Sequence, residues 1–279
     1  LAVRGWVDLG PLDHTARERG ERVLEAFWPG PLTMVLPVGS AIPGLVTSGL
    51  DTVAVRSPRH PVFQAVLEHL DAPLAAPSAN RFGRISPTRA ADVFEELAGR
   101  IPLIIDGGPT EVGVESTIVR LERDGAITLL RSGGCPMEAI EQVAGCRLKG
   151  AGQDDQSAPG RLASHYAPGH RMRPLPGPAG KLSAADVRAL VDGCAPEQPV
   201  GLLLFAPLNE DEQSRLRSLF DRPVDVRVLG EDSEPAARAL FRSMRELDRV
   251  PDVVLFAEPV TRAHGLWPAI AERLNKAMA

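Results

Sequence analysis

The chain has 279 residues, of which 44% are hydrophobic and 24% charged, and its net charge at pH 7 is -5. This length predicts two domains, because domains cluster at about 100–150 residues, and the composition excludes a disordered or fibrous protein. The negative charge and the lack of any Lys/Arg run argue against a dedicated nucleic-acid scaffold, and no apolar run is long enough to cross a bilayer. We therefore expect a small-molecule enzyme in the cytoplasm that has no membrane partner.

The first half alternates short β-rich runs with amphipathic helices, which indicates an α+β domain with a mixed sheet. The predicted helices are 15–27, 60–70, 88–98 and 137–143, and the predicted strands are 32–37, 52–56, 73–76, 103–105, 116–121 and 127–130. In the third helix Ala90, Val93, Phe94 and Leu97 follow the spacing i, i+3, i+4, i+7, and Gly99 marks its end. This spacing predicts that one apolar face packs on a sheet.

Residues 150–173 are rich in Gly, Pro, Ser and Gln and lack an apolar period, so they are predicted to be a linker. The segment nevertheless contains Ser157-Ala158-Pro159-Gly160 and His165-Tyr166-Ala167-Pro168, although a plain spacer needs neither an aromatic residue nor a histidine. Linker histidines seldom do chemistry, and the sequence leaves the roles of His165 and His170 open.

After the linker, continuous apolar strands alternate with helices, which predicts a small Rossmann-like parallel sheet covered on both faces. The predicted helices are 184–191, 210–220, 235–247 and 267–278, and the predicted strands are 200–205, 224–228 and 253–256. The predicted organisation is thus a first domain at 1–149, a linker at 150–173 and a C-terminal α/β domain at 174–279.

The cysteines and lysines limit the chemistry that is available. The three cysteines, Cys135, Cys146 and Cys194, match neither a disulfide framework nor a zinc site, so we expect free thiols in a reducing compartment. The only lysines are Lys149, Lys181 and Lys276. Any phosphate contact in the first half must therefore come from arginine or from backbone N–H groups.

Polar residues follow the predicted strands, at the ends where open α/β sheets bind their ligands. They are Arg56, the turn Ser78-Ala79-Asn80, and Arg131. Each alone is more often a solvated cation or a local turn cap. Together, arginine forks can bind a carboxylate or phosphate, and hydroxyl, amide and N–H groups can cradle a polyphosphate without a covalent nucleophile.

Two further serines have structural and functional interpretations that the sequence leaves open. Ser86 lies in Ser86-Pro87-Thr88, which is either an anion-binding helix start or an ordinary one. Ser116 lies at the start of an apolar strand, in Glu115-Ser116-Thr117, where a lone serine is more often structural.

The order of these segments resembles the YrdC-like threonylcarbamoyl-AMP synthases, in their long form with a C-terminal accessory domain. The matching segments are Phe27-Trp28-Pro29-Gly30-Pro31-Leu32-Thr33, 49–56, Ala76-Pro77-Ser78-Ala79-Asn80, Ser86-Pro87-Thr88, Asp106-Gly107-Gly108, Val114-Glu115-Ser116-Thr117 and Leu130-Arg131. The Ser-Ala-Pro-Gly and His-Tyr-Ala-Pro segments resemble the linker of the long form, and Ala257-Glu258-Pro259 resembles part of its accessory domain. The resemblance thus covers nearly the whole chain.

The resemblance implies a nucleotidyl transfer for threonylcarbamoyladenosine modification of tRNA. Threonine's amine would capture bicarbonate or CO2 as a carbamate, whose oxygen attacks the α-phosphate of ATP and expels pyrophosphate. Arg56, Ala76 and Ser116 would lie beside L-threonine. The residues implied for ATP are Thr52, Ser78, Asn80, Ser86, Arg131 and Tyr166, with Tyr166 making the linker a lid over the nucleotide.

The resemblance also implies partners and one departure. Mg²⁺ is expected on the phosphates, without a visible set of protein ligands for the metal. The tRNA threonylcarbamoyl transferase machinery is the expected downstream partner, with weak RNA binding as a further expectation. The family carries a Lys-x-Arg motif before a strand whose end resembles Leu1-Ala2-Val3-Arg4. We therefore expect an N-terminally truncated chain with impaired activity.

Two alternatives to the synthase remain at this point. The chain could be a nucleotide- or RNA-binding module of the same fold that has lost catalysis. It could also be the YrdC-like module of hydrogenase-maturation carbamoyltransferases, although the acylphosphatase and zinc-finger segments that accompany that module are absent.

Overall fold

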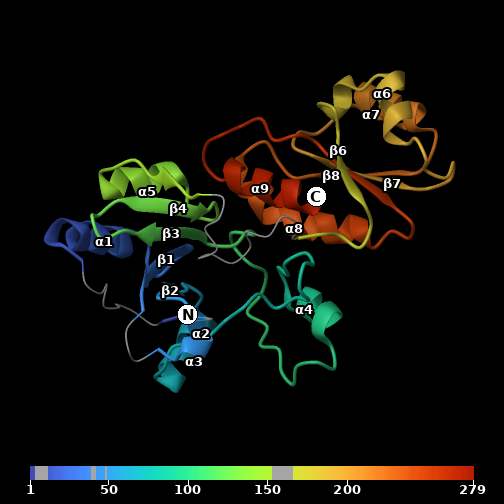
Figure 1. Ribbon diagram of the computed structural model, residues 1–279. Helices are drawn as coiled ribbons and strands as arrows, with labels where there is room; N and C mark the ends of the chain where they lie inside the picture. The colour runs from blue at the N-terminus through green and yellow to red at the C-terminus, as the bar shows by residue number, and fades with distance from the viewer. Residues whose placement is uncertain (4–11, 39–41, 48, 153–165) are drawn as a thin grey trace. The chain divides into compact units, whose positions relative to one another are not determined.

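The computed structural model describes residues 1–3, 12–38, 42–47, 49–152 and 166–279, which are drawn in colour in Figure 1. It divides into two compact units. The first unit contains Leu1–Ser78, Glu115–Leu162 and His264–Ala269, and the second contains Ala79–Val114, Ala163–Ala263 and Ile270–Ala279. The boundaries predicted from the sequence, at 149/150 and 173/174, stay a prediction. No helix in the described part of the chain is long and apolar enough to cross a membrane.

The first unit is built on a five-stranded mixed sheet, as the sequence predicts. Its strands, in spatial order, are β2 (Thr52–Val55), β1 (Leu32–Pro37), β3 (Thr117–Leu121), β4 (Ile127–Arg131) and β5 (Lys149–Gly150). β1 runs antiparallel to β2 and parallel to β3, whereas β4 runs antiparallel to β3 and parallel to β5.

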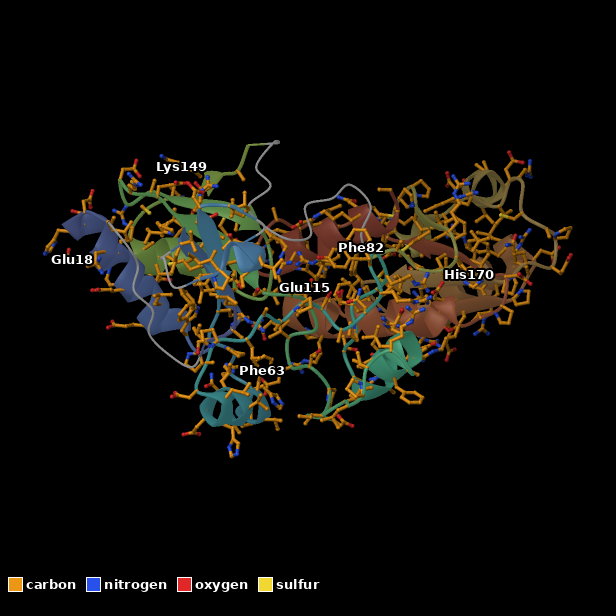
Figure 2. All side chains as sticks on the ribbon, turned by 60° about the horizontal axis from the view of Figure 1, so that its bottom comes forward. Glu18, Phe63, Phe82, Glu115, Lys149 and His170 are labelled. Carbon is orange, nitrogen blue, oxygen red and sulfur yellow. The ribbon has the colours of Figure 1, made fainter. Side chains whose placement is uncertain are left out.

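One face of this sheet is covered by two helices, which lie side by side in Figure 1. They are α1 (His14–Phe27), whose residue Glu18 is labelled in Figure 2, and α5 (Met137–Ala144). Apolar side chains of both helices, such as Leu24 and Ile140, pack against Met34 and Val119 of the sheet. This face forms the main core, and burial there raises the pKa of the free Cys135 thiol to about 12.

The opposite face has a much smaller apolar cluster, formed by Val35, Ile118 and Leu130 with Ala54 and Ala151 beside them. Successive side chains of a strand point to opposite faces of a sheet. The polar residues that alternate with the main core therefore lie on this second face.

Two strands predicted for the first half do not form. In the predicted strand 73–76 only Leu74 pairs, in an isolated bridge with Ala2. Residues 103–105 belong to no strand, and both Leu103 and Ile105 are exposed. Short apolar runs flanked by proline are weak strand signals, because proline cannot donate to a sheet ladder. Conversely, α2 (Gly44–Thr47) and β5 are too short to give a sequence signal, and α3 (Pro61–Leu70) forms as predicted.

The second unit contains a four-stranded parallel sheet, which confirms the prediction for the C-terminal half. Its strands, in spatial order, are β6 (Met172–Pro174), β9 (Val254–Ala257), β7 (Val200–Leu204) and β8 (Val224–Val228). The helices along this part of the chain are η1 (Ala179–Lys181), α6 (Ala184–Leu190), α7 (Glu210–Phe220), α8 (Ser233–Asp248) and α9 (Trp267–Ala277), of which the residues from Ile270 onward belong to this unit.

The parallel sheet is covered on both faces. On one side Leu202 and Leu204 pack with side chains of α6 and α7, including Val187 and Leu216. On the other side a Cβ added at Gly201 would lie 3.2 Å from a side-chain carbon of Leu247 in α8, so a glycine lets this helix approach closely. In the sequence one apolar face of α8 is predicted by helical spacing, and all of its residues are buried: Ala237, Leu240, Phe241, Met244 and Leu247.

The helix α4 (Ala90–Leu97) contradicts the sequence prediction in two respects. It begins at Ala90 rather than at Thr88, and the residues that it buries are Asp92 and Glu96, whereas Phe94 is 65% exposed. The predicted apolar face of this helix was therefore wrong. An amphipathic pattern assumes that charged residues face water, but buried carboxylates are stable when they receive enough hydrogen bonds. Asp92, for example, accepts from the backbone nitrogens of Thr88 at 3.0 Å and Arg89 at 3.1 Å.

Candidate active site

The register of the first sheet brings several predicted site residues to one end of it. Val55 lies opposite Met34, which places Arg56, the next residue, opposite Thr33. Thr33 in turn pairs with Ile118, and Ile118 pairs with Arg131. The ends of β2 and β4 and the starts of β1 and β3 therefore meet at the same edge, although they are far apart in the sequence.

Arg131 and Ser116 form the centre of this edge. Both residues are buried, with exposed fractions of 8% and 6%. The Arg131 guanidinium donates from Nη2 to the Ser116 carbonyl oxygen at 2.9 Å and approaches Ser116 Oγ at 3.4 Å. The buried contact fixes the direction of the Arg131 guanidinium beside the serine hydroxyl.

The glycines that follow Arg131 allow its loop to pack closely on Ser116. A Cβ added at Gly133 would lie 2.3 Å from the Ser116 carbonyl carbon, so a side chain there is excluded. The next residue, Gly134, donates its backbone N–H to the backbone carbonyl oxygen of Glu115 at 2.8 Å. The close approach of this loop to Ser116 is the reason that a glycine stands at position 133.

Thr33 belongs to the same cluster but was not among the predicted site residues. Its hydroxyl lies 2.7 Å from Ser116 Oγ, and both side chains are buried. Thr33 ends the quoted Phe-Trp-Pro-Gly-Pro-Leu-Thr segment and is a polar residue in an otherwise apolar strand, which was a usable signal. The two hydroxyls hold one another in a defined orientation next to Arg131.

Arg56 shares this edge and experiences an unfavourable electrostatic environment. Burial, followed by the positive charge of Arg131, lowers the pKa of Arg56 from its ordinary value. Two guanidinium groups that disfavour each other's charge in a partly desolvated place are stabilised by an anion that binds between or beside them. The edge is therefore suited to a carboxylate or a phosphate.

For three further predicted residues of the first unit, the structure gives no direct contact with Arg131 or Ser116 among those described above. Thr52 begins β2 and lies on the same face as Arg56, because the two are four residues apart in an extended segment. Ala76 and Ser78 are exposed and follow Leu74, whose backbone N–H bonds to the Ala2 carbonyl at 3.0 Å. Their roles beside threonine and ATP stay a prediction.

Asn80 and Ser86 lie in the second unit. The Asn80 amide donates to the carbonyl oxygens of Arg81 at 2.8 Å and Arg84 at 3.2 Å, which closes the turn that follows it. Its Oδ1 is buried and has no hydrogen-bond partner among the described residues. Ser86 is buried shortly before α4. Their predicted contact with ATP stays a prediction.

Tyr166, also in the second unit, is 1% exposed and adopts a positive φ of 63°. Its ring stacks on Phe241 of α8 with 5.4 Å between centroids, and the Arg273 guanidinium lies 5.6 Å from the ring centre. The next residue, Ala167, donates its N–H to the Gly83 carbonyl at 2.8 Å. The structure thus brings the end of the linker beside the Asn80 turn, and the contact of Tyr166 with a nucleotide stays a prediction. His165 and Arg4 lie outside the described residues.

Within the described parts of the chain, no group of three or more His, Cys, Asp or Glu side chains is placed to hold a metal ion. The chemistry that this edge of the first sheet offers consists of guanidinium groups and hydroxyl groups. These groups can orient anionic substrates and stabilise charge on them without forming a covalent intermediate.

Comparison with known proteins agrees with this chemistry. A family model described as telomere recombination matches residues 3–133, and one described as the C-terminal domain of threonylcarbamoyl-AMP synthase matches residues 135–279. A threonylcarbamoyl-AMP synthase of Pyrococcus abyssi is 38% identical over 282 residues, which cover 99% of this chain and 78% of that protein. One of Schizosaccharomyces pombe is 34% identical over 277 residues, which cover 91% of this chain and 65% of that protein.

Solved structures show the same similarity. The crystal structure of P. abyssi Sua5 complexed with L-threonine superimposes with a TM-score of 0.82 at 36% identity, covering 99% of this chain and 78% of that one. A P. abyssi Sua5 variant, in which a histidine and the following tyrosine are both replaced by alanine, gives a TM-score of 0.81 at 35% identity, covering 99% and 77%. From the matched models, the identity along the chain and the shared fold, this chain belongs to the threonylcarbamoyl-AMP synthase family.

Proposed function

We propose that this protein forms threonylcarbamoyl-AMP and pyrophosphate from L-threonine, bicarbonate or CO2, and ATP. Membership of the synthase family supports this reaction over a nucleotide- or RNA-binding module without catalysis. The observation that carries the proposal is the pair Arg56 and Arg131, whose like charges act on one another at the edge where Ser116 and Thr33 also lie. This arrangement is suited to substrates with a carboxylate and phosphates.

In the threonine half of the site, Arg56 binds the substrate carboxylate. A planar guanidinium can donate two parallel hydrogen bonds to a carboxylate, which fixes the orientation of the amino acid as well as its charge. The Ser116 hydroxyl and the Ala76 carbonyl then lie beside the amino group and the hydroxyl of threonine. This half of the proposal is supported by the L-threonine complex of the related P. abyssi protein.

In the nucleotide half, Arg131 faces the phosphates, and Thr52, Ser78, Asn80, Ser86 and Tyr166 complete the binding site. The amine of threonine adds to CO2 and releases a proton to solvent, which gives a carbamate. A carbamate oxygen then attacks the α-phosphorus of ATP, and the bond from this phosphorus to the bridging oxygen breaks as pyrophosphate leaves. The protein performs a nucleotidyl transfer by holding the two anions in line and stabilising the charge on the α-phosphate.

We expect Mg²⁺ to bind as a complex with ATP. The described residues offer no cluster of carboxylates, histidines or cysteines for it. Mg²⁺ keeps several water ligands and often binds through substrate phosphates, so an ion carried by ATP needs no dedicated protein cage. Its role would be to neutralise charge on the departing pyrophosphate.

The product, a mixed anhydride, requires protection from water and a consumer. We infer that the linker with Tyr166 acts as the lid and that a tRNA threonylcarbamoyl transferase consumes the product, with weak RNA binding and a cytoplasmic location as parts of the same proposal. The lid would reduce hydrolysis of the anhydride before transfer.

The reaction is tested by incubating the purified protein with ATP, L-threonine, bicarbonate and Mg²⁺ and measuring pyrophosphate release. We expect release only when all four are present, and we expect ¹⁸O from labelled bicarbonate in the bridge between carbamate carbon and phosphorus. Pyrophosphate release that does not depend on threonine would contradict the proposal. A control variant is Arg59→Gln, which changes an exposed arginine three residues after Arg56. It should release pyrophosphate at the rate of the wild type.

A further inference from the structure

The last residue of α8, Asp248, holds the end of the linker. Its side chain is 11% exposed. Oδ2 accepts the backbone N–H of Gly169 at 2.8 Å, and Oδ1 accepts that of His170 at 2.9 Å and lies 3.0 Å from the His170 Nδ1 atom. His170 is labelled in Figure 2. One carboxylate therefore fixes the backbone three and four residues after Tyr166.

The same carboxylate reaches the segment that follows Asn80. Arg84 Nη2 donates to Asp248 Oδ2 at 3.5 Å. The Arg84 carbonyl oxygen in turn accepts a hydrogen bond from the Asn80 side-chain amide. The two segments also pair directly, in a parallel bridge between Arg84 and Ala167. Gly169 allows this approach, since a Cβ there would lie 3.3 Å from the Arg84 guanidinium nitrogens and 3.4 Å from Asp248 Oδ2.

A second buried carboxylate fixes the same segment from α4. Glu96 has a side-chain exposure of 4%, accepts a hydrogen bond from Arg81 at 2.9 Å and forms an ion pair with Arg245 of α8 at 3.3 Å. Arg245 also donates to the backbone carbonyl of Ile85. Residues 81–85 are thus held by α8 at Asp248 and Arg245 and by α4 at Glu96.

These contacts depend on one another. A desolvated carboxylate is stable only while its donors remain in place, and the donors of Asp248 come from two segments. If the linker end moves away, Asp248 loses three of its contacts, and if residues 81–84 move, it loses the arginine. The ordering of one segment therefore favours the ordering of the other.

We propose that Asp248 is a positioning residue through which the C-terminal part of the chain couples two loops, the Asn80 turn and the linker end at Tyr166. The coupling itself stands on contacts within the second unit. Its consequence for nucleotide binding rests on the proposed function, in which Asn80 and Tyr166 contact ATP. The C-terminal part then acts on the nucleotide site through the Asp248 carboxylate, with the contacts of Arg245 in support.

The test is an Asp248→Asn variant, which keeps the shape of the side chain but removes its charge and one acceptor. Hydrogen exchange is measured for the amides of residues 80–86 and 166–170, and the Kd values of ATP and L-threonine are measured by calorimetry. We expect exchange to rise about tenfold in both segments together and the Kd of ATP to rise about tenfold, with the Kd of threonine changed less than twofold.

The matched control is Glu246→Gln on the same helix. Glu246 pairs with Arg242 at 2.8 Å and Arg227 at 3.3 Å, both outside the two loops, so this variant should leave exchange and both Kd values unchanged. A second variant, Arg84→Gln, removes the other half of the contact and should reproduce the Asp248→Asn exchange pattern, which guards against a fold defect specific to one substitution.

The coupling is overturned if exchange rises at residues 166–170 alone, or if Asp248→Asn weakens ATP and threonine binding equally, as a general loss of structure would. Failure of the proposed function looks different. In that case the wild type binds no ATP at all, and the exchange measurement still decides whether Asp248 couples the loops.

Discussion

Arginines in the two units have opposite electrostatic surroundings. In the first unit, burial and the neighbouring Arg131 lower the pKa of Arg56. In the second unit, the hydrogen bond that Arg249 donates to the Glu95 carboxylate raises the pKa of Arg249. The same residue type is thus destabilised as a cation in one place and stabilised in the other. An arginine beside a carboxylate completes the fold, whereas an arginine beside another arginine is suited to bind an anion that the chain does not supply.

The second unit extends this pattern into its interior. Burial alone would raise the pKa of Glu96, but hydrogen bonding from Arg81 and the charges of Arg245, Arg81 and Arg84 outweigh it, so the pKa lies below its ordinary value. The buried carboxylate and its arginines form a structural cluster. The contrast with Arg56 can be tested by removing one charge from each region.

The largest expected effect follows Arg56→Gln. We expect the Kd of L-threonine to rise about a hundredfold, because a bidentate contact between two ions is worth about 3 kcal/mol. The free energy of unfolding of the ligand-free protein should not fall, since the variant removes one of two like charges. Calorimetry and urea unfolding measure the two quantities.

Arg59→Gln is the control for that variant, because Arg59 is exposed in the same segment. Unchanged threonine binding in Arg56→Gln would contradict the proposal that Arg56 binds an anion. An equal loss of stability in Arg56→Gln and Arg59→Gln would contradict it as well.

Glu96→Gln tests the other region and should act in the opposite way. We expect the free energy of unfolding to fall by about 2 kcal/mol, because the buried Arg245 loses its compensating charge. The neighbouring Glu95→Gln removes an exposed ion pair with Arg249 and should cost less than about 1 kcal/mol. Urea unfolding compares them, and equal losses would show that the burial of Glu96 has no energetic role.

Thr33→Val sharpens the comparison inside the first unit. The variant removes the hydroxyl that contacts Ser116 Oγ, so we expect threonine binding to weaken about fivefold, corresponding to about 1 kcal/mol. Thr128→Val is the matched control, because Thr128 is also buried in this sheet but donates to Glu122 at 2.9 Å, away from the site. The same affinity in Thr33→Val and wild type would remove Thr33 from the site.

The smallest effect is a difference in pH dependence. The pKa values of Glu96 and Asp92 are lowered, in both cases because hydrogen bonds and arginine charges outweigh burial. Their contribution to stability is therefore present above the unfolded values of about 4.3 and 3.9 and is lost as pH falls through the lowered folded values.

The comparison is made between urea unfolding at pH 7 and at about pH 2.5, below the unfolded values of both carboxyl groups. The free energy of unfolding should fall toward the lower pH, and Glu96→Gln should reduce this fall, whereas Arg56→Gln should leave it unchanged. An identical pH dependence in all three proteins would contradict a role for the buried carboxylates.

The sequence alone determined the features that depend on local pattern. Alternating apolar strands and helices predicted the parallel sheet of the second unit and the buried face of α8, and polar residues after the strands pointed to Arg56 and Arg131. Ser116 was implied only by the family resemblance. Such patterns are informative because burial follows the period of each element. The family resemblance predicted the reaction, and the matched family models and relatives confirmed the family.

Only the tertiary structure decided which charges are satisfied inside the protein. The pattern of α4 predicted a buried apolar face, yet Asp92 and Glu96 are buried and Phe94 is exposed. Asp92 has local donors in Thr88 and Arg89, whereas Glu96 is paired with Arg81 and Arg245, which are 15 and 149 residues away. Thr33 joined the site through a strand register, and Asp248 reached two loops through contacts across 79 and 164 residues. A charge is buried or exposed according to neighbours that are distant in the sequence, and local periodicity contains no information about them.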